Sequence, residues 1–446
     1  DKNYFKAYNN LGNTLEKKGK LDEAISAYET TLKINPDHVQ AKSQLLYLKR
    51  KICDFSATEE IEKLSASLGI NTSSVSPFVA LCWTDNPEQQ FLRSKNYAAE
   101  TFKNSNGKKK ISFQIKKSKI KIGYLSGDFY DFPSMHLMIG HLESHNRNLY
   151  EIYAFSYGPN NNDWMNKRAK SAVDHFIDIK NFSDKEIIKI IRDYKIDISI
   201  DENGYTYNSR TGLLKNRLSP IQINFLGYPG TIGGDFIDYI IADPIVIPKN
   251  KKKFYSEKII YLPHSYQPND NLRKISEIKT SRKDFNLPEK SFVFCCFNSS
   301  YKISSIEFNI WMRVLKKIEN SVLWLLKTNV WANKNLCLEA KKAGVNPNRI
   351  IFAERLPQSE HLSRHKHADL FLDTFNYNAH TTASDALWAG LPLVTKIGNQ
   401  FASRVSASLL NAINLTELIT KNYEEYEKLI LELATNSNKL SEIRTK

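Results

Sequence analysis

Hydrophobic positions change their period along the chain, and the change divides it into a helical first part and an alternating remainder. From residue 120 onward, short apolar runs alternate with segments of helical periodicity. Strands are expected at 120–126, 150–156, 196–200, 221–226, 239–241, 292–297, 321–326, 349–352, 370–372 and 391–395. Helices are expected at 136–142, 184–193, 304–318, 334–343 and 360–367. Strands separated by single helices predict two doubly wound parallel sheets, an α/β class of fold.

The helical first part carries one clear repeat. Positions on the spacing of a tetratricopeptide unit are Tyr8, Leu11, Gly12, Leu15, Ala24, Tyr28 and Pro36. Residues 38–52 continue at helical period, like the first helix of a further unit. One repeat cannot bury its own face, so we expect the end of a longer array. An unrelated helical hairpin is the alternative.

A helical connector follows the repeat, with helices expected at 59–68 and 88–97. Residues 103–117 are polar and basic and predict an exposed linker. The expected division is a repeat segment at 1–53, a connector and linker at 54–118, and two Rossmann-like halves at 119–270 and 271–446. Two such halves imply a cleft, and ligands of open sheets bind at that edge.

Composition limits the class of protein. At 446 residues the chain is too long for one core, and 41% of its residues are hydrophobic. No apolar run approaches the length of a membrane span, and the first residues lack a signal pattern. Five cysteines form no CxxC pair, and their odd number disfavours a complete disulfide framework. We therefore expect a cytoplasmic protein that does not contact a membrane.

The formal net charge of +15 raises the question of nucleic-acid binding. Lysine runs at 108–110, 116–117 and 251–253 would serve it. These runs fall where linkers are expected, and the chain is rich in Lys, Asn and Ile throughout, which compositional bias also explains. No nucleic-acid partner is expected, although the charge favours acidic partners or anionic cosubstrates.

Residues 368–395 form the stretch most suggestive of chemistry. The expected strand at 370–372 is followed by a polar loop, by Thr381, Thr382 and Ser384 as possible N-caps, and by a helix from Asp385. In open parallel sheets such a helix points free N–H groups and its positive dipole end into the ligand crevice. A diphosphate would suit this place. The alternative is that these residues are only a helix cap with a histidine nearby.

Two further motifs follow expected strands. Lys302 comes after the strand at 292–297, where it could neutralise charge on a leaving diphosphate; a solvated loop lysine is the alternative. Gly227, Tyr228 and Pro229 follow the strand at 221–226, where glycine allows a backbone to approach a ligand closely. An ordinary turn explains them equally well.

A set of motifs in fixed order makes a resemblance specific. They are IGYLSGDF (122–129), MHLM (135–138), DHFID (174–178), LGYPGT (226–231), IDYIIAD (237–243), FNSSYKI (297–303), NSVLWLLK (320–327), NRIIF (348–352), HTTASDALWAGLPLVT (380–395) and ASRVSASLL (402–410). Together they resemble the tetratricopeptide-fused protein O-glycosyltransferases of family 41, which include O-linked N-acetylglucosamine transferases and Spindly-like enzymes. The resemblance covers nearly the whole chain. Within the family, the chain is similar to bacterial-type members.

The resemblance implies a GT-B fold, in which two Rossmann-like halves face a cleft that holds a nucleotide sugar. It implies an inverting transferase without a metal ion or other cofactor, moving N-acetylglucosamine from a UDP-sugar cosubstrate to Ser or Thr of protein acceptors that the repeats bind. Fucose from GDP and glucose from UDP are alternative donors. A degenerate protein that binds nucleotide and peptide without chemistry is a further alternative.

The resemblance also implies roles for single residues. Lys302 would hold the diphosphate, His380, Thr381 and Thr382 the phosphates, Asp385 the ribose, and His361 would lie near the uridine. The remaining donor contacts would come from Gly227, Tyr228, Pro229, Ser299, Leu356, Gln358 and Tyr377.

The chain departs from the family pattern at several positions. Phe132 stands where a histidine usually faces the reacting centre, and phenylalanine cannot take a proton. His175, which matches a second family histidine, and Asp131 are the candidate substitutes, while His136 is expected to be structural. Tyr377 and Gln358 replace a cysteine and a lysine of the animal enzymes. We expect the chain to be a fragment at both ends.

Overall fold

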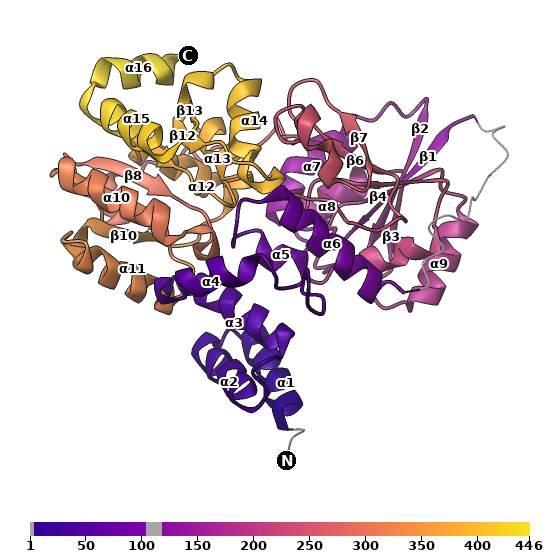
Figure 1. Ribbon diagram of the computed structural model, residues 1–446. Helices are drawn as coiled ribbons and strands as arrows, with labels where there is room; N and C mark the ends of the chain where they lie inside the picture. The colour runs from indigo at the N-terminus through magenta and orange to yellow at the C-terminus, as the bar shows by residue number, and fades with distance from the viewer. Residues whose placement is uncertain (1–3, 104–117) are drawn as a thin grey trace. The chain divides into compact units, whose positions relative to one another are not determined.

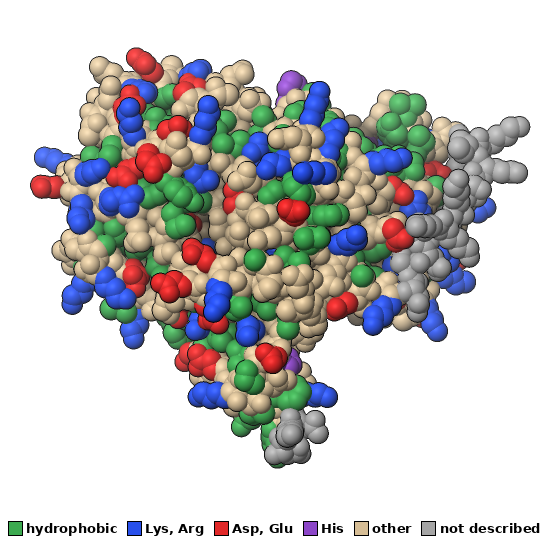
Figure 2. Space-filling model, in the orientation of Figure 1, with side chains coloured by type: hydrophobic (Ala, Val, Ile, Leu, Met, Phe, Trp, Pro, Cys, Tyr) green, Lys and Arg blue, Asp and Glu red, His purple; other side chains and the backbone are tan. Residues whose placement is uncertain are grey.

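The computed structural model describes residues 4–103 and 118–446 (Figure 1). Two compact units divide it: one comprises residues 1–75, 79–86 and 274–446, and the other residues 76–78 and 87–273. No helix of the described part is long and apolar enough to cross a membrane. Lys and Arg side chains are spread over the face drawn in Figure 2, with Asp and Glu among them.

The first unit begins with the predicted helical repeat. Helices α1 (Tyr4–Lys17) and α2 (Leu21–Ile34) pack against each other, and the Tyr28 ring is fully buried between them. A Cβ on Gly12 would lie 2.7 Å from that ring, so glycine is what lets the two helices approach. Helix α3 (Val39–Lys51) follows, and its N-cap His38 accepts a hydrogen bond from the Ala41 N–H.

The carboxyl end of α3 is bound by side chains from the second α/β half. The Lys51 carbonyl accepts hydrogen bonds from Ser300 Oγ at 2.6 Å and Asn329 Nδ2 at 2.9 Å. The Ile52 carbonyl accepts one from Asn335 Nδ2 at 2.8 Å. The last carbonyls of a helix lack intrahelical partners, so these contacts fix α3 to this unit.

A six-stranded parallel sheet forms the core of the first unit. Its order is β10-β9-β8-β11-β12-β13. The strands are β8 (Phe292–Cys296), β9 (Ser321–Leu326), β10 (Ile350–Ala353), β11 (Leu370–Leu372), β12 (Leu393–Lys396) and β13 (Ile419–Thr420). The helices are α10 (Ser305–Lys317), α11 (Val330–Lys342), α12 (Gln358–Arg364), α13 (Thr381–Trp388), α14 (Val405–Ala412), α15 (Tyr423–Thr435) and α16 (Ser437–Thr445). The strand order reverses between β8 and β11, the place where open sheets bind ligands.

The second unit is built on a seven-stranded parallel sheet of order β3-β2-β1-β4-β5-β6-β7. The strands are β1 (Ile120–Ser126), β2 (Tyr150–Ser156), β3 (His175–Asp178), β4 (Ile198–Asp201), β5 (Ile221–Asn224), β6 (Tyr239–Ala242) and β7 (Lys258–Tyr261). The helices are α7 (Pro133–Glu143), α8 (Trp164–Ser171) and α9 (Asp184–Asp193), preceded by α6 (Pro87–Thr101). Here the order reverses between β1 and β4.

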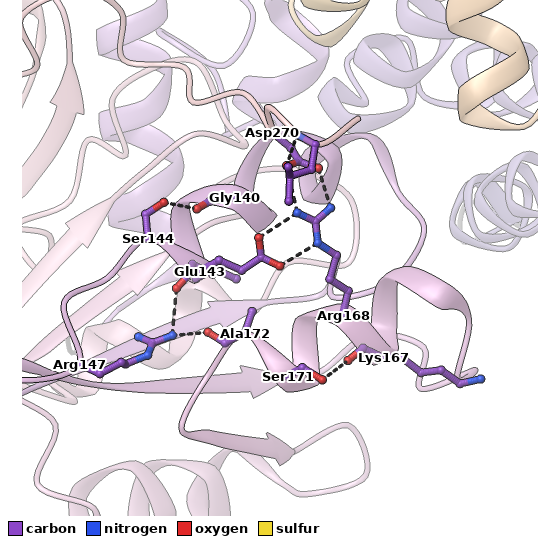
Figure 3. Close-up of polar contacts among 11 residues, drawn as sticks. Gly140, Glu143, Ser144, Arg147, Lys167, Arg168, Ser171, Ala172 and Asp270 are labelled. Carbon is purple, nitrogen blue, oxygen red and sulfur yellow. Dashed lines mark hydrogen bonds and ion pairs between the residues drawn. The ribbon is translucent and has the colours of Figure 1, made fainter. Parts of the chain in front are cut away.

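Arg168 links three segments of the second unit (Figure 3). Its guanidinium, on α8, donates two hydrogen bonds of 2.8 Å to Glu143, the last residue of α7. It donates two more, of 2.6 and 3.0 Å, to Asp270, which follows β7 and is 1% exposed. These charge-assisted bonds hold the segment after β7 against α7 and α8.

The predicted fold class is confirmed, and most predicted elements lie at or near their expected places. Strands β1, β2, β9 and β11 and helix α9 have the predicted bounds. Helix α11 begins at Val330, earlier than expected, because Asn329 caps it by accepting from the Ala332 N–H. The elements β3, β7, β13, α8 and α14–α16 were not predicted. Of the predicted linker, only residue 103 falls in the described part of the chain. The connector contains α4 (Thr58–Ser65) and α5 (Pro77–Ala80) in addition to α6.

Candidate active site

Lys302 lies at the reversal point of the first unit's sheet. It ends the single 3-10 turn Ser300–Lys302 that follows β8. Its Nζ donates a hydrogen bond of 2.8 Å to the Asn378 carbonyl and lies 3.8 Å from the centroid of the Tyr377 ring. Burial lowers the pKa of Lys302 to about 7, although nearby Asp373 and Cys296 favour the charged form.

The loop whose Asn378 carbonyl accepts the hydrogen bond from Lys302 is held together by Asp373. This buried carboxylate follows β11 and accepts hydrogen bonds from the N–H groups of Thr374 and Ala379, at 2.8 and 2.6 Å, and from the Thr395 hydroxyl, at 2.7 Å. Burial raises the pKa of Asp373 to about 6. The sequence analysis missed Asp373, although a carboxylate directly after a buried strand signalled it.

Helix α13 starts earlier than its sequence suggested. The interpretation of Thr381, Thr382 and Ser384 as N-caps is wrong: the helix begins at Thr381, and His380 is the N-cap residue without a side-chain cap bond. The eight-residue link between β11 and α13 is held in its conformation by the hydrogen bonds of Asp373 to the Thr374 and Ala379 N–H groups, and not by a threonine cap. The Thr382 hydroxyl instead donates to the side-chain oxygen of Asn298, which follows β8.

His380 is held as a neutral ring at the start of α13. Its Nε2 lies 3.1 Å from the Ala402 carbonyl and donates to it. Burial, and then the neighbouring charge of Lys302, hold the pKa of His380 well below its usual value. The first N–H groups of a helix have no intrahelical acceptor, so the start of α13 next to Lys302 is suited to an anion.

Three predicted donor-binding residues meet one turn further along α13. Asp385 is buried, and its Oδ1 accepts a hydrogen bond of 3.2 Å from Gln358 Nε2. Its Oδ2 lies 3.5 Å from His361 Nε2. A carboxylate flanked by an amide and an imidazole can bind the hydroxyls and the base edge of a nucleoside.

Two other predicted residues border this region. Ser299 precedes the turn that holds Lys302, and its carbonyl accepts from the Lys302 N–H at 3.0 Å. Leu356 is half-buried between β10 and α12. All ten predicted donor and catalytic residues between 299 and 385 thus belong to loops and helices at the carboxyl edge of one sheet.

A second polar cluster occupies the reversal point of the other unit. Asn203, after β4, accepts hydrogen bonds through Oδ1 from the Gly127 N–H at 2.8 Å and the Tyr157 hydroxyl at 2.7 Å. Its Nδ2 donates to Asp128 Oδ2 at 3.0 Å. Burial raises the pKa of Asp128. Neither Asn203 nor Asp128 was among the predicted site residues, although each lies two residues beyond the end of its strand, β4 for Asn203 and β1 for Asp128.

The turn Gly227-Tyr228-Pro229 packs against this cluster. Leu226 has a φ of +78°, and a Cβ on Gly227 would lie 2.1 Å from the Glu202 carbonyl oxygen, so only glycine fits. Tyr228 is buried, and its hydroxyl accepts a hydrogen bond of 2.7 Å from Gln90 Nε2 of α6. The backbone at Gly227 therefore approaches β4 closely, while the Tyr228 side chain braces α6.

The two candidate substitutes for the missing histidine are not brought together. Asp131 Oδ1 lies 2.8 Å from Nε2 of buried His136, and its Oδ2 accepts a hydrogen bond from Trp164 Nε1 at 3.0 Å. His175 lies at the first residue of β3, where its Nε2 is 2.8 Å from Glu151 Oε1. Phe132 is 39% exposed at the N-cap of α7.

His175 also lies away from the carboxyl edge of its sheet, the edge at which open parallel sheets bind ligands. It pairs with Tyr153 across the β2–β3 ladder, and β3 ends at Asp178. At about 3.3 Å per residue, three residues separate it from the carboxyl end by about 10 Å. Asp131, in contrast, follows β1 at that end. Among the described residues, no group of three or more His, Cys, Asp or Glu side chains is arranged to hold a metal ion.

Comparisons with known proteins identify the family of this chain and support its fold. Residues 97–279 and 271–446 match Glycosyl transferase family 41, and residues 5–38 match the tetratricopeptide repeat. The chain is 36% identical over 406 residues to a probable UDP-N-acetylglucosamine–peptide N-acetylglucosaminyltransferase, SEC, of Arabidopsis thaliana, covering 86% of this chain and 41% of that protein. It is 26% identical to the Caenorhabditis elegans UDP-N-acetylglucosamine–peptide N-acetylglucosaminyltransferase, covering 82% and 41%.

Among solved structures, a Thermobaculum terrenum O-GlcNAc transferase mutant superposes with a TM-score of 0.78 at 23% identity, covering 99% of this chain and 78% of that one. This likeness supports the GT-B fold. The chain spans about two fifths of the length of these two curated relatives. The resemblance inferred from the motifs is confirmed, and the chain belongs to glycosyl transferase family 41.

Proposed function

We propose that this protein is a protein O-glycosyltransferase that moves N-acetylglucosamine from UDP-N-acetylglucosamine to Ser or Thr hydroxyls. The observation that carries the proposal is the arrangement at the reversal point of the first unit's sheet. There the ammonium of Lys302 lies beside the start of α13, and Asp385 with Gln358 and His361 lies one turn further on. Family membership and the curated relatives support the donor and the acceptor class.

The proposed mechanism is an inverting displacement without a metal ion. The acceptor hydroxyl oxygen attacks the anomeric carbon while the bond to the diphosphate breaks, and the hydroxyl proton passes to the leaving diphosphate or to water. Lys302 and the N–H groups at the start of α13 stabilise the negative charge that develops on the leaving diphosphate. Positive charge from the protein then takes the place that a divalent cation has in other transferases.

A second candidate is a protein that binds nucleotide and peptide without transferring sugar. Phe132 supports it, because this position offers no proton acceptor. The hydrogen bonds of Asp131 to His136 and Trp164, and of His175 to Glu151, support it too, since both candidate substitutes are engaged elsewhere.

A donor panel tests the proposal. Wild type is assayed with UDP-N-acetylglucosamine, UDP-glucose and GDP-fucose against acceptor peptides, beside Lys302→Met and Lys327→Met. Lys327 is the matched control, because its side chain is 43% exposed and forms an ion pair with Glu354. We expect turnover with UDP-N-acetylglucosamine that Lys302→Met abolishes and Lys327→Met preserves. Turnover with another donor would reassign the sugar, and nucleotide binding without any turnover would establish the second candidate.

A further inference from the structure

The ring of Tyr377 is buried, and one of its faces contacts the ammonium of Lys302. Lys302 Nζ lies 3.8 Å from the ring centroid, and Tyr377 is 6% exposed. The same loop supplies the Asn378 carbonyl that accepts a hydrogen bond from Nζ. Two neighbouring residues of one loop therefore fix the position of this ammonium.

A row of tyrosines continues from this ring into the repeat segment. The ring of Tyr301 lies 6.0 Å from that of Tyr377, at an interplanar angle of 63°. The ring of Tyr47, on helix α3, lies 5.6 Å from that of Tyr301. These spacings are within the range of favourable aromatic pairs. Tyr301 is also the residue directly before Lys302. The row therefore constrains Lys302 through its backbone, at Tyr301, and through its side chain, at the Tyr377 ring.

A ring face stabilises an ammonium without neutralising it. The quadrupole of Tyr377 attracts the cation, whereas a carboxylate in contact would cancel the charge that a diphosphate needs. The other groups facing Lys302 are Asp373 after β11, Cys296 at the end of β8 and His380 before α13. Burial makes the ring contact worth more than it would be in water.

We propose that Tyr377, held in place through Tyr301 by Tyr47 of the repeat segment, is a positioning residue that raises the proton affinity of Lys302 and fixes the position of its ammonium. The residue was predicted as a donor contact; its geometry assigns it to the lysine. The consequence for catalysis rests on the proposed function, but the effect on Lys302 itself does not.

The test compares Tyr377→Leu with Tyr377→Phe, which keeps the ring. The fraction of Lys302 that reacts with acetic anhydride is measured by mass spectrometry between pH 5.5 and 9. We expect Tyr377→Phe to match wild type and Tyr377→Leu to lower the proton affinity of the Lys302 amine about tenfold. Equal titrations of Lys302 in the Leu and Phe variants would overturn the proposal.

The outer part of the row is tested by Tyr47→Leu and Tyr47→Phe. The control is Tyr8→Leu, because Tyr8 is exposed on α1 and belongs to no such row. We expect Tyr47→Leu to shift the Lys302 titration in the same direction by about threefold, with Tyr47→Phe and Tyr8→Leu unchanged. A Tyr47→Leu titration identical to the Tyr8→Leu titration would remove the repeat segment from the proposal.

Activity distinguishes this proposal from the function it rests on. If wild type transfers sugar, Tyr377→Leu is expected to lower kcat more than it raises KM for the donor, because charge on Lys302 matters most as the diphosphate leaves. If wild type transfers no sugar while the labelling difference persists, the proposed function fails and the role of Tyr377 stands.

Discussion

Lys302 is a buried lysine whose charge would change on binding an anionic ligand. Burial has lowered its pKa to about 7, so that near neutral pH the free protein holds a mixture of ammonium and amine. An anionic diphosphate favours the ammonium, and binding must therefore take up a proton from solvent whenever the amine predominates.

This linkage predicts the pH dependence of UDP binding. Above pH 7 the affinity should fall as pH rises, by up to about tenfold per unit, until the pKa of the complex is passed. His380 stays neutral throughout this range, because its pKa lies well below its usual value. Calorimetry between pH 7 and 9 in buffers of different ionisation enthalpy measures both affinity and proton uptake. Lys302→Met should bind weakly with no such dependence, and an affinity of wild type that is constant between pH 7 and 9 would contradict the assignment.

Phe132 gives a second prediction for a single residue. A placed base usually contributes about a hundred- to ten-thousand-fold, so its absence should leave a slow enzyme. Because Asp131 and His175 are engaged elsewhere, we expect Phe132→His to raise kcat more than tenfold, while His175→Ala changes it less than threefold. A rapid wild type that loses activity on His175→Ala or Asp131→Asn would show that one of these groups has taken over the proton.

The positions of site residues at a sheet edge could be predicted from the sequence, but the directions and neighbours of their side chains could not. Lys302 and Asp385 were predicted at the carboxyl edge because their distance along the chain from a buried strand decides the edge. The neighbours of His175, Tyr153 and Glu151, could not be predicted, because the direction of a strand residue depends on register and tertiary contacts. Asn203 was missed because an amide after a strand has no distinctive sequence signal.

At the scale of elements, helix α13 is braced to the strands on both sides of the reversal point. The Thr382 hydroxyl donates to Asn298, whose Nδ2 donates to the Thr374 hydroxyl at 2.9 Å. The Thr374 hydroxyl in turn donates to the Tyr377 carbonyl at 2.6 Å. The start of the helix is thereby tied to the loop that holds Lys302.

This bracing predicts different results for two adjacent threonines. Thr382→Val removes a hydroxyl that is already bound, so both thermal stability and UDP affinity should fall. Thr381→Val should lower UDP affinity about tenfold with little change in Tm, since only a contact to a charged phosphate is lost. Calorimetry and thermal unfolding measure the two effects. Equal Tm values for the two variants would show that the bracing has no energetic weight.

The link made by Arg168 predicts an element-scale loss. Arg168→Met removes the guanidinium that pairs with the buried carboxylate of Asp270, and breaking such a buried pair typically costs about 3 to 5 kcal/mol. Arg313→Met is the matched control, because Arg313 is exposed and its pair with Glu427 should contribute under about 1 kcal/mol. Hydrogen exchange of α8 amides measures the local stability. Similar protection in both variants would show that the Asp270 pair behaves like a surface pair.

Three of the missed elements, β7, β13 and α8, share a physical cause. Strands β7 and β13 lie at sheet edges, where one side has no neighbour and the apolar signal is short. Helix α8 carries only a narrow buried face, formed by Met165, Asn166 and Ala169. Hydrophobic periodicity is a weak signal in elements that bury little apolar surface, so these three were missed while the central strands were found.

At the scale of the whole molecule, the net charge of +15 acts on every anionic partner. Positive side chains spread over a surface attract acidic ligands at long range. At 0.1 M, salt largely screens the attraction between charges more than about 10 Å apart. Acceptor peptides rich in Asp and Glu should therefore show a KM that rises severalfold between 50 and 200 mM salt. Neutral peptides of the same length should show little change. Kinetic assays at the two salt concentrations measure the difference, and equal slopes would contradict a role for the overall charge.

The attachment of α3 limits how this chain can be rearranged. Its terminal carbonyls are acceptors for Ser300, Asn329 and Asn335, so removing α3 would strand three donors on the surface of the α/β half. A repeat array can lengthen, shorten or be exchanged upstream of α3, but α3 itself has to travel with the half to which it is bonded. We therefore expect a chimaera to keep the fold of this half when the exchange point lies before α3, so that α3 stays with the sheet to which it is bonded.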